Sequence, residues 1–132
     1  MGQAIICKGL KKQLGNFTLD YPVFTVAEGT VHGLIGANGS GKTTTLKLLL
    51  GLLRQDAGDI SVLGSTNIGV DDQARNSIGF MVDGAGIPSM LNPIELGRLF
   101  QSLYTYWDAS YYQQLLMQFH PDAKKPYRKC SR

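Results

Sequence analysis

The residue pattern with the clearest chemistry runs from Gly36 to Thr43 and reads Gly-Ala-Asn-Gly-Ser-Gly-Lys-Thr. It fits the pattern G-x-x-x-x-G-K-[ST] of a phosphate-binding loop, or P-loop. A triphosphate is a dense cluster of negative oxygens, and glycines allow a ring of backbone N–H groups to approach those oxygens closely. The pattern therefore predicts a site for a nucleoside triphosphate with Mg²⁺, and we expect the nucleotide to be ATP.

The side chains at the end of this loop also suit a triphosphate. Lys42 carries a positive charge that can reach the β- and γ-phosphates, which makes it the expected catalytic residue of the loop. Thr43 carries a hydroxyl that can bind Mg²⁺, and the helix that follows would point its partly positive N-terminus at the phosphates. The predicted nucleotide-binding residues of the loop are Gly36, Asn38, Gly39, Ser40, Gly41, Lys42 and Thr43.

The elements on either side of the loop are those that such a site needs. The mostly apolar run from Thr30 to Ile35 predicts a strand that is buried on both faces of a parallel sheet. The run from Lys42 to Leu53 predicts a helix, and because its leucines fall on nearly every side, we expect protein to cover most of it. Strand, loop and helix in this order are the context that the pattern requires.

The rest of the chain alternates between strand and helix patterns. Further strands are predicted at Ala4–Cys7, Asn16–Asp20, Val23–Val26, Ile60–Leu63 and Ile78–Val82. Helices are predicted at Asp71–Asn76, from the N-cap Asn92 to about Tyr104, and from the cap Asp108 to Pro121. This order indicates an α/β domain preceded by a small antiparallel sheet.

Composition excludes several other classes of protein. The chain has 132 residues, of which 43% are hydrophobic and 17% charged, as is typical of one soluble globular domain. Its net charge of +3 is too small to indicate a nucleic-acid partner. Cys7 and Cys130 have no metal-ligand spacing, and we expect Cys7, in an apolar run, to be buried. The longest apolar stretch, Thr45 to Leu53, is far short of the roughly 20 residues of a membrane span, so a cytosolic protein is expected.

Beyond the loop, the sequence resembles the ATP-binding subunits of ABC transporters, in particular those of bacterial exporters. The resemblance covers essentially the whole chain and lies in Gly29–Thr44, in Gly51-Leu52-Leu53 with Gly58-Asp59-Ile60 and Gly64 after it, in Ile78–Asp83 and in Tyr106-Trp107-Asp108. It implies an α/β fold with a P-loop NTPase (RecA-like) core. The implied subdomains are an N-terminal antiparallel β subdomain (1–29), the P-loop core (30–87) and the start of a helical subdomain (88–132).

The resemblance also implies further site residues. Thr44 would contact the α-phosphate. Asp83 stands where the family usually has a glutamine that helps to bind Mg²⁺ and couples the site to the membrane subunit; an aspartate keeps the oxygen ligand but is shorter by one methylene. The aromatic residue that stacks on adenine is expected near Leu14. Since leucine cannot stack, Phe17 is the candidate substitute, and the binding of adenine is expected to be weak or tolerant of other bases.

In its full-length form, a protein of this family couples ATP hydrolysis to transmembrane transport. The resemblance implies a membrane-spanning transporter subunit and a second ATP-binding subunit as partners, no nucleic acid, and a cytoplasmic location on the inner face of the cell membrane. Cys130-Ser131-Arg132 align with the start of the family's signature motif, L-S-G-G-Q, so the sequence covers an incomplete domain. The family's Walker B aspartate and catalytic glutamate would follow Arg132. We therefore expect the 132-residue chain alone to bind ATP without hydrolysing it, and to be marginally stable because Thr30–Ile35 would lack neighbouring strands.

Other functions stay open on sequence alone. Asp83-Gly84-Ala85-Gly86 matches the D-x-x-G pattern of GTPases, although no N-K-x-D pattern for guanine follows it. A small-molecule kinase would begin at the P-loop, whereas strands are predicted before it in this chain. A truncated remnant that binds nucleotide or only a partner protein, without turnover, is the remaining alternative. Outside the site, an aromatic cluster is expected to pack the helical subdomain: Tyr104, Tyr106, Trp107, Tyr111 and Tyr112.

Overall fold

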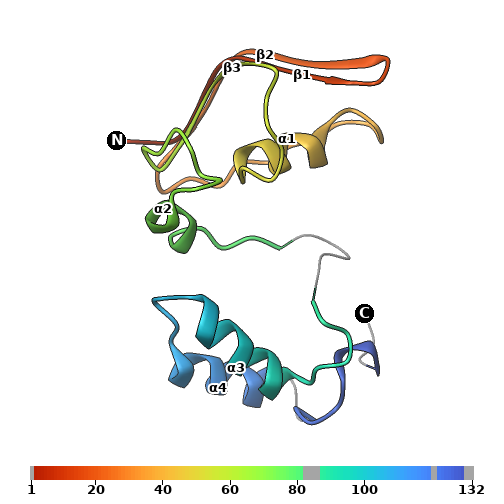
Figure 1. Cartoon of the computed structure of the whole chain (residues 1–132), viewed down its shortest axis with the longest axis vertical. Coiled ribbons are helices and arrows are strands. Elements are labelled where there is room, and N and C mark those ends of the chain that lie inside the picture. Colours follow the sequence, from red (N-terminus) through yellow and green to blue (C-terminus); the bar gives the residue numbers. More distant parts are fainter. Residues whose placement is uncertain (1, 82–86, 120–121, 130–132) are drawn as a thin grey trace. The chain divides into compact units, whose positions relative to one another are not determined.

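The computed structural model describes residues 2–81, 87–119 and 122–129. The chain divides into two compact units, Met1–Ile78 and Gly79–Arg132, which we call the N-terminal and C-terminal units. The N-terminal unit holds the sheet and two helices, and the C-terminal unit holds the remaining helices (Figure 1). None of the helices in the described ranges is long and apolar enough to cross a membrane.

The sheet of the N-terminal unit is antiparallel, with three strands in the order β2-β1-β3. β1 (Gln3–Leu14) pairs with β2 (Phe17–Ala27) in a long hairpin and with β3 (Ala57–Val62) along its other edge. The predicted antiparallel sheet is therefore confirmed. The predicted division of this segment into two strands, Asn16–Asp20 and Val23–Val26, is wrong, because β2 continues through Pro22. β2 is an edge strand, where a proline without an N–H group is tolerated.

The core of the N-terminal unit is formed by one face of the sheet and by α1 (Lys42–Leu49), the helix that follows the P-loop (Figure 1). Cys7 is fully buried, as expected, and desolvation raises the pKa of its thiol. The thiol thus stays protonated and packs as a small apolar side chain. The buried residues of this core are Cys7, Leu10, Leu19, Leu48, Leu49, Ile60, Val62, Ile68 and Ala74.

α1 is shorter and less covered than the sequence predicts. The helix ends at Leu49 and not at Leu53, and Gly51 just beyond it adopts a left-handed conformation with φ 67°. Glycine commonly ends helices in this way because it has no Cβ to clash in that conformation. Only one side of α1 is buried, and Leu46 is 49% exposed.

The predicted strand Thr30–Ile35 does not form. Val31 and Ile35 are 101% and 95% exposed, and none of the three described strands pairs with this segment. A central strand of a parallel sheet is ordered by backbone hydrogen bonds to neighbours on both sides, and the described residues supply none to this segment. For the same reason, residues 78–81 of the predicted Ile78–Val82 strand are not a strand, and Val82 lies outside the described residues.

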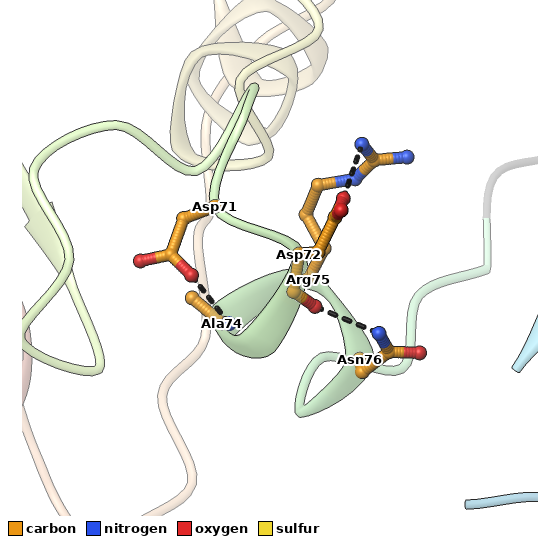
Figure 2. A network of polar contacts seen from close by, with 5 residues as sticks. All are labelled: Asp71, Asp72, Ala74, Arg75 and Asn76. Carbon is orange, nitrogen blue, oxygen red and sulfur yellow. Dashed lines mark hydrogen bonds and ion pairs between the residues drawn. The ribbon is translucent and has the colours of Figure 1, made fainter. Parts of the chain in front are cut away.

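The short helix α2 (Asp72–Asn76) is confirmed and is stabilised by local polar contacts (Figure 2). Asp71 caps its N-terminus: the Oδ1 atom accepts the Ala74 N–H at 3.0 Å, and this bond is the main cause of the lowered pKa of Asp71. The Arg75 guanidinium donates to the Asp72 carboxylate at 3.4 Å. The Asn76 side-chain amide donates to the backbone carbonyl of Asp72 at 2.8 Å. These contacts explain why so short a helix forms.

The C-terminal unit contains α3 (Pro93–Leu103) and α4 (Ala109–Phe119). α3 begins with the expected caps. The Glu95 N–H donates to Asn92 Oδ1 at 3.0 Å, and the Asn92 N–H donates to Glu95 Oε2 at 2.9 Å. Asp108 caps α4 by accepting a backbone N–H of its first turn at 2.8 Å. Both predicted helix starts are therefore confirmed.

Aromatic side chains join α3 and α4. The Tyr112 hydroxyl donates to the Pro93 carbonyl at 2.7 Å, and the Trp107 and Tyr112 ring centroids lie 4.9 Å apart. Tyr106 and Tyr111 are 82% and 58% exposed, so the predicted packing role is wrong for these two residues.

The last described element is the 3₁₀ helix η1 (Tyr127–Lys129). Its Tyr127 N–H donates to the Leu91 carbonyl at 3.0 Å, which ties it to the segment before α3.

Asp56 ties the segment between α1 and β3 to the hairpin, and it makes the fold sensitive to acid. Its carboxylate accepts the Gln13 N–H and the Lys12 ammonium, each at 2.7 Å, and these bonds hold the pKa of Asp56 below its ordinary value. The resulting stability is fully present above the unfolded pKa, near 4, and is lost as the pH falls through the folded pKa. We expect urea melts between pH 5 and pH 2.5 to show a smaller loss of stability for Asp56→Asn than for the unchanged chain. Equal losses would contradict this role of Asp56.

Candidate nucleotide-binding site

The P-loop is a tight backbone turn that leads directly into α1. Gly39 and Gly41 have φ values of 83° and 90°, a left-handed conformation that costs other residue types about 1–2 kcal/mol. The Ser40 N–H donates to the Ala37 carbonyl at 3.2 Å and closes the turn. Gly41 is the N-cap residue of α1. Its glycine identity is required by conformation as well as by the sequence pattern.

The glycines of the loop also lie close to neighbouring side chains. A Cβ on Gly41 would lie 2.8 Å from Leu19 Cδ1 and 3.3 Å from Phe17 Cε1, both on β2. A Cβ on Gly36 would lie 2.5 Å from Ser40 Oγ. The loop is therefore compact. Because glycine has no side chain, the backbone of the loop stays open to a ligand at these positions.

Lys42 lies over the loop. Its ammonium donates to the Gly36 carbonyl at 2.7 Å and to the Ala37 carbonyl at 2.8 Å. Hydrogen bonds from a charged donor are strong, so these two bonds hold the positive charge at the loop. A bound triphosphate could accept the same ammonium protons with negatively charged oxygens in place of neutral carbonyls.

The N-terminus of α1 is open to an anion. Among the described residues no side chain caps it, and its first turn contains no acidic residue. Thr43 and Thr44 stand in this first turn, directly after Lys42. Unpaired backbone N–H groups and the helix dipole together favour negative charge at this end of a helix.

Two residues that sequence reasoning missed anchor the loop to the sheet. Thr45 is 1% exposed, and its hydroxyl donates to the Gly41 carbonyl at 3.0 Å. The Tyr21 hydroxyl of β2 lies 3.4 Å from the Thr45 Oγ1. The run of three threonines from Thr43 to Thr45 is the only signal in the sequence, because the sequence does not show which hydroxyl faces the core.

A pocket of about 380 Å³ lies beside the loop. One wall comes from the loop and α1, and the other comes from Leu14 and Phe17 at the end of the hairpin. The structure thus brings together the loop and the two hairpin residues at the position expected for the nucleotide base. The lining residues are Leu14, Phe17, Asn38, Gly39, Gly41, Lys42, Thr43 and Thr44. A second cavity, of about 440 Å³, includes Leu48, Arg54 and Asn67 in its lining and contains none of the loop residues.

The first turn of α1 offers an oxygen ligand that would suit a metal ion. The described residues contain no group of three or more His, Cys, Asp or Glu side chains that could hold a metal ion. Thr43 offers a hydroxyl oxygen in the first turn of α1, a ligand type that suits Mg²⁺. Asp83, the second predicted metal ligand, lies outside the described residues, as do Cys130, Ser131 and Arg132.

Comparisons with known proteins show the family to which the chain belongs. The family model described as ABC transporter matches residues 19–119. A probable multidrug ABC transporter ATP-binding protein of Escherichia coli, YbhF, is 34% identical over 105 residues, which are 78% of this chain and 18% of that protein. The daunorubicin resistance ATP-binding protein DrrA3 of Streptomyces coeruleorubidus is 38% identical over 102 residues, which are 76% of this chain and 32% of that protein. The Nod factor export ATP-binding protein I of Ralstonia nicotianae is 44% identical over 73 residues, which are 54% of this chain and 23% of that protein.

Solved structures give the same fold. The ATP-binding subunit of an ABC transporter superposes with a TM-score of 0.80 and 25% identity, over 97% of this chain and 56% of that one. A dimeric ATP-binding cassette bound to ADP and Pi has a TM-score of 0.75 at 17% identity, over 96% of this chain and 63% of that one, and supports the fold alone.

The chain corresponds to only part of each of these proteins. It spans between about a fifth and a third of the length of the three curated relatives. It spans little more than half of the ATP-binding subunit of known structure. None of the three relatives is named as a GTPase. The antiparallel sheet, the P-loop and the match of the family model to most of the chain show that the chain belongs to the ABC transporter family and is part of a P-loop ATP-binding domain.

Proposed function

We propose that the chain binds MgATP at the P-loop. The observation that supports this most directly is the Lys42 ammonium over the loop, next to an uncapped helix N-terminus. In this proposal Lys42 binds the β- and γ-phosphates, Thr43 binds Mg²⁺ through its hydroxyl, and Thr44 contacts the α-phosphate. Asp83 would add a carboxylate oxygen to the metal. The phosphates would contact the residues Gly36, Asn38, Gly39, Ser40, Gly41, Lys42, Thr43 and Thr44.

When bound, MgATP would supply the metal charge and the phosphate leaving group for the hydrolysis proposed for the full-length protein, and this chain's residues would bind and orient it. Lys42 keeps a positive charge at the phosphates, and the backbone of the loop holds their oxygens in place. The Thr45 hydroxyl bonds to the Gly41 carbonyl and lies 3.4 Å from the Tyr21 hydroxyl of β2, which links the start of α1 to the sheet. These contacts suit a rigid phosphate site.

For the full-length protein we propose the function that its relatives' names indicate. Two of them are named for export or multidrug transport and one for drug resistance. We therefore propose that the full-length protein is an exporter ATPase. It would couple ATP hydrolysis to transport, with a membrane-spanning subunit and a second ATP-binding subunit as partners. It would lie in the cytoplasm on the inner face of the membrane. The proposed subdomains are 1–29, 30–87 and 88–132.

The binding of MgATP is tested by titration calorimetry on the 132-residue chain. We expect binding with Mg²⁺ present, weaker binding after the metal is removed with EDTA, and no release of phosphate, because hydrolysis needs a polarised water and a second subunit's signature motif. Phosphate release that disappears with Lys42→Ala would contradict the proposal that the chain alone binds without turnover. If the titration with MgATP gave no heat of binding, the proposed site itself would be contradicted.

A further inference from the structure

The cavity of about 440 Å³ lies at the C-terminal end of α1, and we call it the helix-end cavity. Its lining comes from the last turn of α1, the segment that follows this helix, β3 and the loop at residues 66–69, all within the N-terminal unit. Its volume falls within the range of about 300–1,000 Å³ that is typical of small-molecule sites. The helix-end cavity shares no lining residue with the pocket beside the P-loop.

The lining has an apolar part and a polar part. The apolar side chains are Leu48, Leu49, Leu53, Ile60 and Ile68, and four of them belong to the buried core with exposed fractions between 2% and 8%. Because core residues form this surface, it is already in place without a ligand. The polar side chains are Arg54, Gln55, Thr66 and Asn67. A cavity of this composition suits a ligand that has both a hydrocarbon part and a polar group.

The charge of the helix-end cavity comes from Arg54. No ion pair or hydrogen bond joins the Arg54 side chain to another residue in the part of the chain that the structure describes. Asp56, the nearest acidic residue in the sequence, is bonded to Lys12 and Gln13 instead. The described lining contains no aspartate or glutamate. A guanidinium without a counter-ion favours a carboxylate or phosphate, because its planar N–H groups can donate two parallel hydrogen bonds to such a group.

Two neutral donors on the loop at residues 66–69 can add to this charge. The Asn67 carbonyl accepts the N–H groups of Val70 and Asp71 at 3.1 Å and 3.0 Å, which fixes the backbone of the loop. Within the described ranges the side-chain amide of Asn67 and the hydroxyl of Thr66 make no hydrogen bond. Both groups are therefore available to donate to an anion in the cavity.

The end of α1 leaves room for an anion. Unpaired carbonyls give a helix C-terminus a partial negative charge, which would repel one. Here the carbonyls of Leu46, Lys47 and Leu48 accept N–H groups from the turn after the helix at 2.9 to 3.2 Å, so the negative potential is reduced. The turn also touches the opposite rim, since a Cβ on Gly51 would lie 2.6 Å from the Gly69 N atom. Both rims of the cavity are thus held in place.

We propose that the helix-end cavity binds a small amphipathic anion, which is a carboxylate or phosphate carried on a short hydrocarbon. Arg54, with the Thr66 hydroxyl and the Asn67 amide, binds the anionic group, and the leucine and isoleucine side chains contact the hydrocarbon. This site is separate from the P-loop and does not depend on the binding of a nucleotide.

The test is a ¹H–¹⁵N NMR titration of the whole chain at neutral pH and constant ionic strength. The probes are hexanoate, hexyl phosphate, acetate and hexan-1-ol, so that the charge and the hydrocarbon are each removed in turn. We expect hexanoate and hexyl phosphate to shift the amide signals of Gly51, Asn67 and Gly69. Acetate and hexan-1-ol should bind at least about tenfold more weakly, because each lacks one of the two parts. The tighter of the two anions identifies the head group that the site prefers.

Arg54→Gln keeps a polar side chain but removes the charge. We expect it to weaken hexanoate by about tenfold and to leave hexan-1-ol unchanged. Lys47→Gln is the matched control, because it removes one positive charge from the exposed side of the same helix without changing the lining, and it should leave both affinities unchanged. Arg54 is exposed and has no partner among the described residues, so the spectrum of the free variant should keep its dispersion.

Four results would overturn the proposal. The first is an absence of shifts with both anions throughout the millimolar range. The second is binding of acetate or hexan-1-ol as tight as that of hexanoate. The third is an equal affinity for hexanoate in Arg54→Gln and the unchanged chain. The fourth is a set of shifts confined to the amides of Gly36 to Thr43, which would place the anion at the P-loop instead.

Discussion

Replacement of Lys42 by alanine is expected to weaken MgATP binding by about 100-fold, the largest effect on binding that we expect of any single change. The ammonium is the only cationic group that the described residues place on the loop, where it lies 2.7 Å and 2.8 Å from two loop carbonyls. Its loss removes charge-assisted hydrogen bonds to the phosphates that no neighbouring side chain replaces. Titration calorimetry at constant salt measures the change, since exposed charges are screened by ions.

The matched control is Lys47→Ala, on the last turn of the same helix. Lys47 is exposed and does not line the pocket beside the loop, so the affinity for MgATP should stay within about twofold. Far-UV circular dichroism of both variants should match that of the unchanged chain. An equal loss of affinity in the two variants would indicate that general electrostatic attraction, and not the position of Lys42, holds the nucleotide.

Replacement of Gly58 by alanine is expected to destabilise the fold by at least about 3 kcal/mol, the largest effect on stability. Gly58 lies in β3 opposite the irregular part of β1, where Gly9 is found, and it has a φ of 82°. A Cβ at this position would overlap the backbone carbonyl of Gly9 and lie 2.6 Å from the Leu10 N atom. The added methyl group therefore carries both a conformational cost and a clash with backbone atoms that cannot rotate away.

Gly15→Ala separates these two costs. Gly15 has a similar left-handed φ of 58°, but a Cβ there would meet nothing within 4 Å. We expect this variant to lose only about 1–2 kcal/mol, the cost of the conformation itself. Urea melts of the two variants give the comparison. If Gly58→Ala cost no more than Gly15→Ala, the close approach of β1 and β3 at this point would be wrong.

Local chemistry explains what the sequence alone determined. The P-loop could be recognised because its function depends on residue types at fixed spacing within one short segment. The helix starts at Asp71, Asn92 and Asp108 could be predicted because a cap bonds to N–H groups only two or three residues away. The antiparallel sheet and the burial of Cys7 followed from alternating and apolar runs.

Contacts between distant segments decided the rest. β2 continues through Pro22 because it is the edge strand, a fact of sheet order that no local pattern contains. Thr30–Ile35 has the composition of a buried strand, but a strand exists only when neighbours accept its backbone hydrogen bonds. Phe17 reaches the P-loop only because the hairpin folds over Gly41, and the sequence separation of the two residues gives no indication of this contact. The sequence by itself thus predicts where phosphates would bind, and the tertiary structure decided which side chains line the pocket beside the loop, because that depends on how the sheet packs against α1.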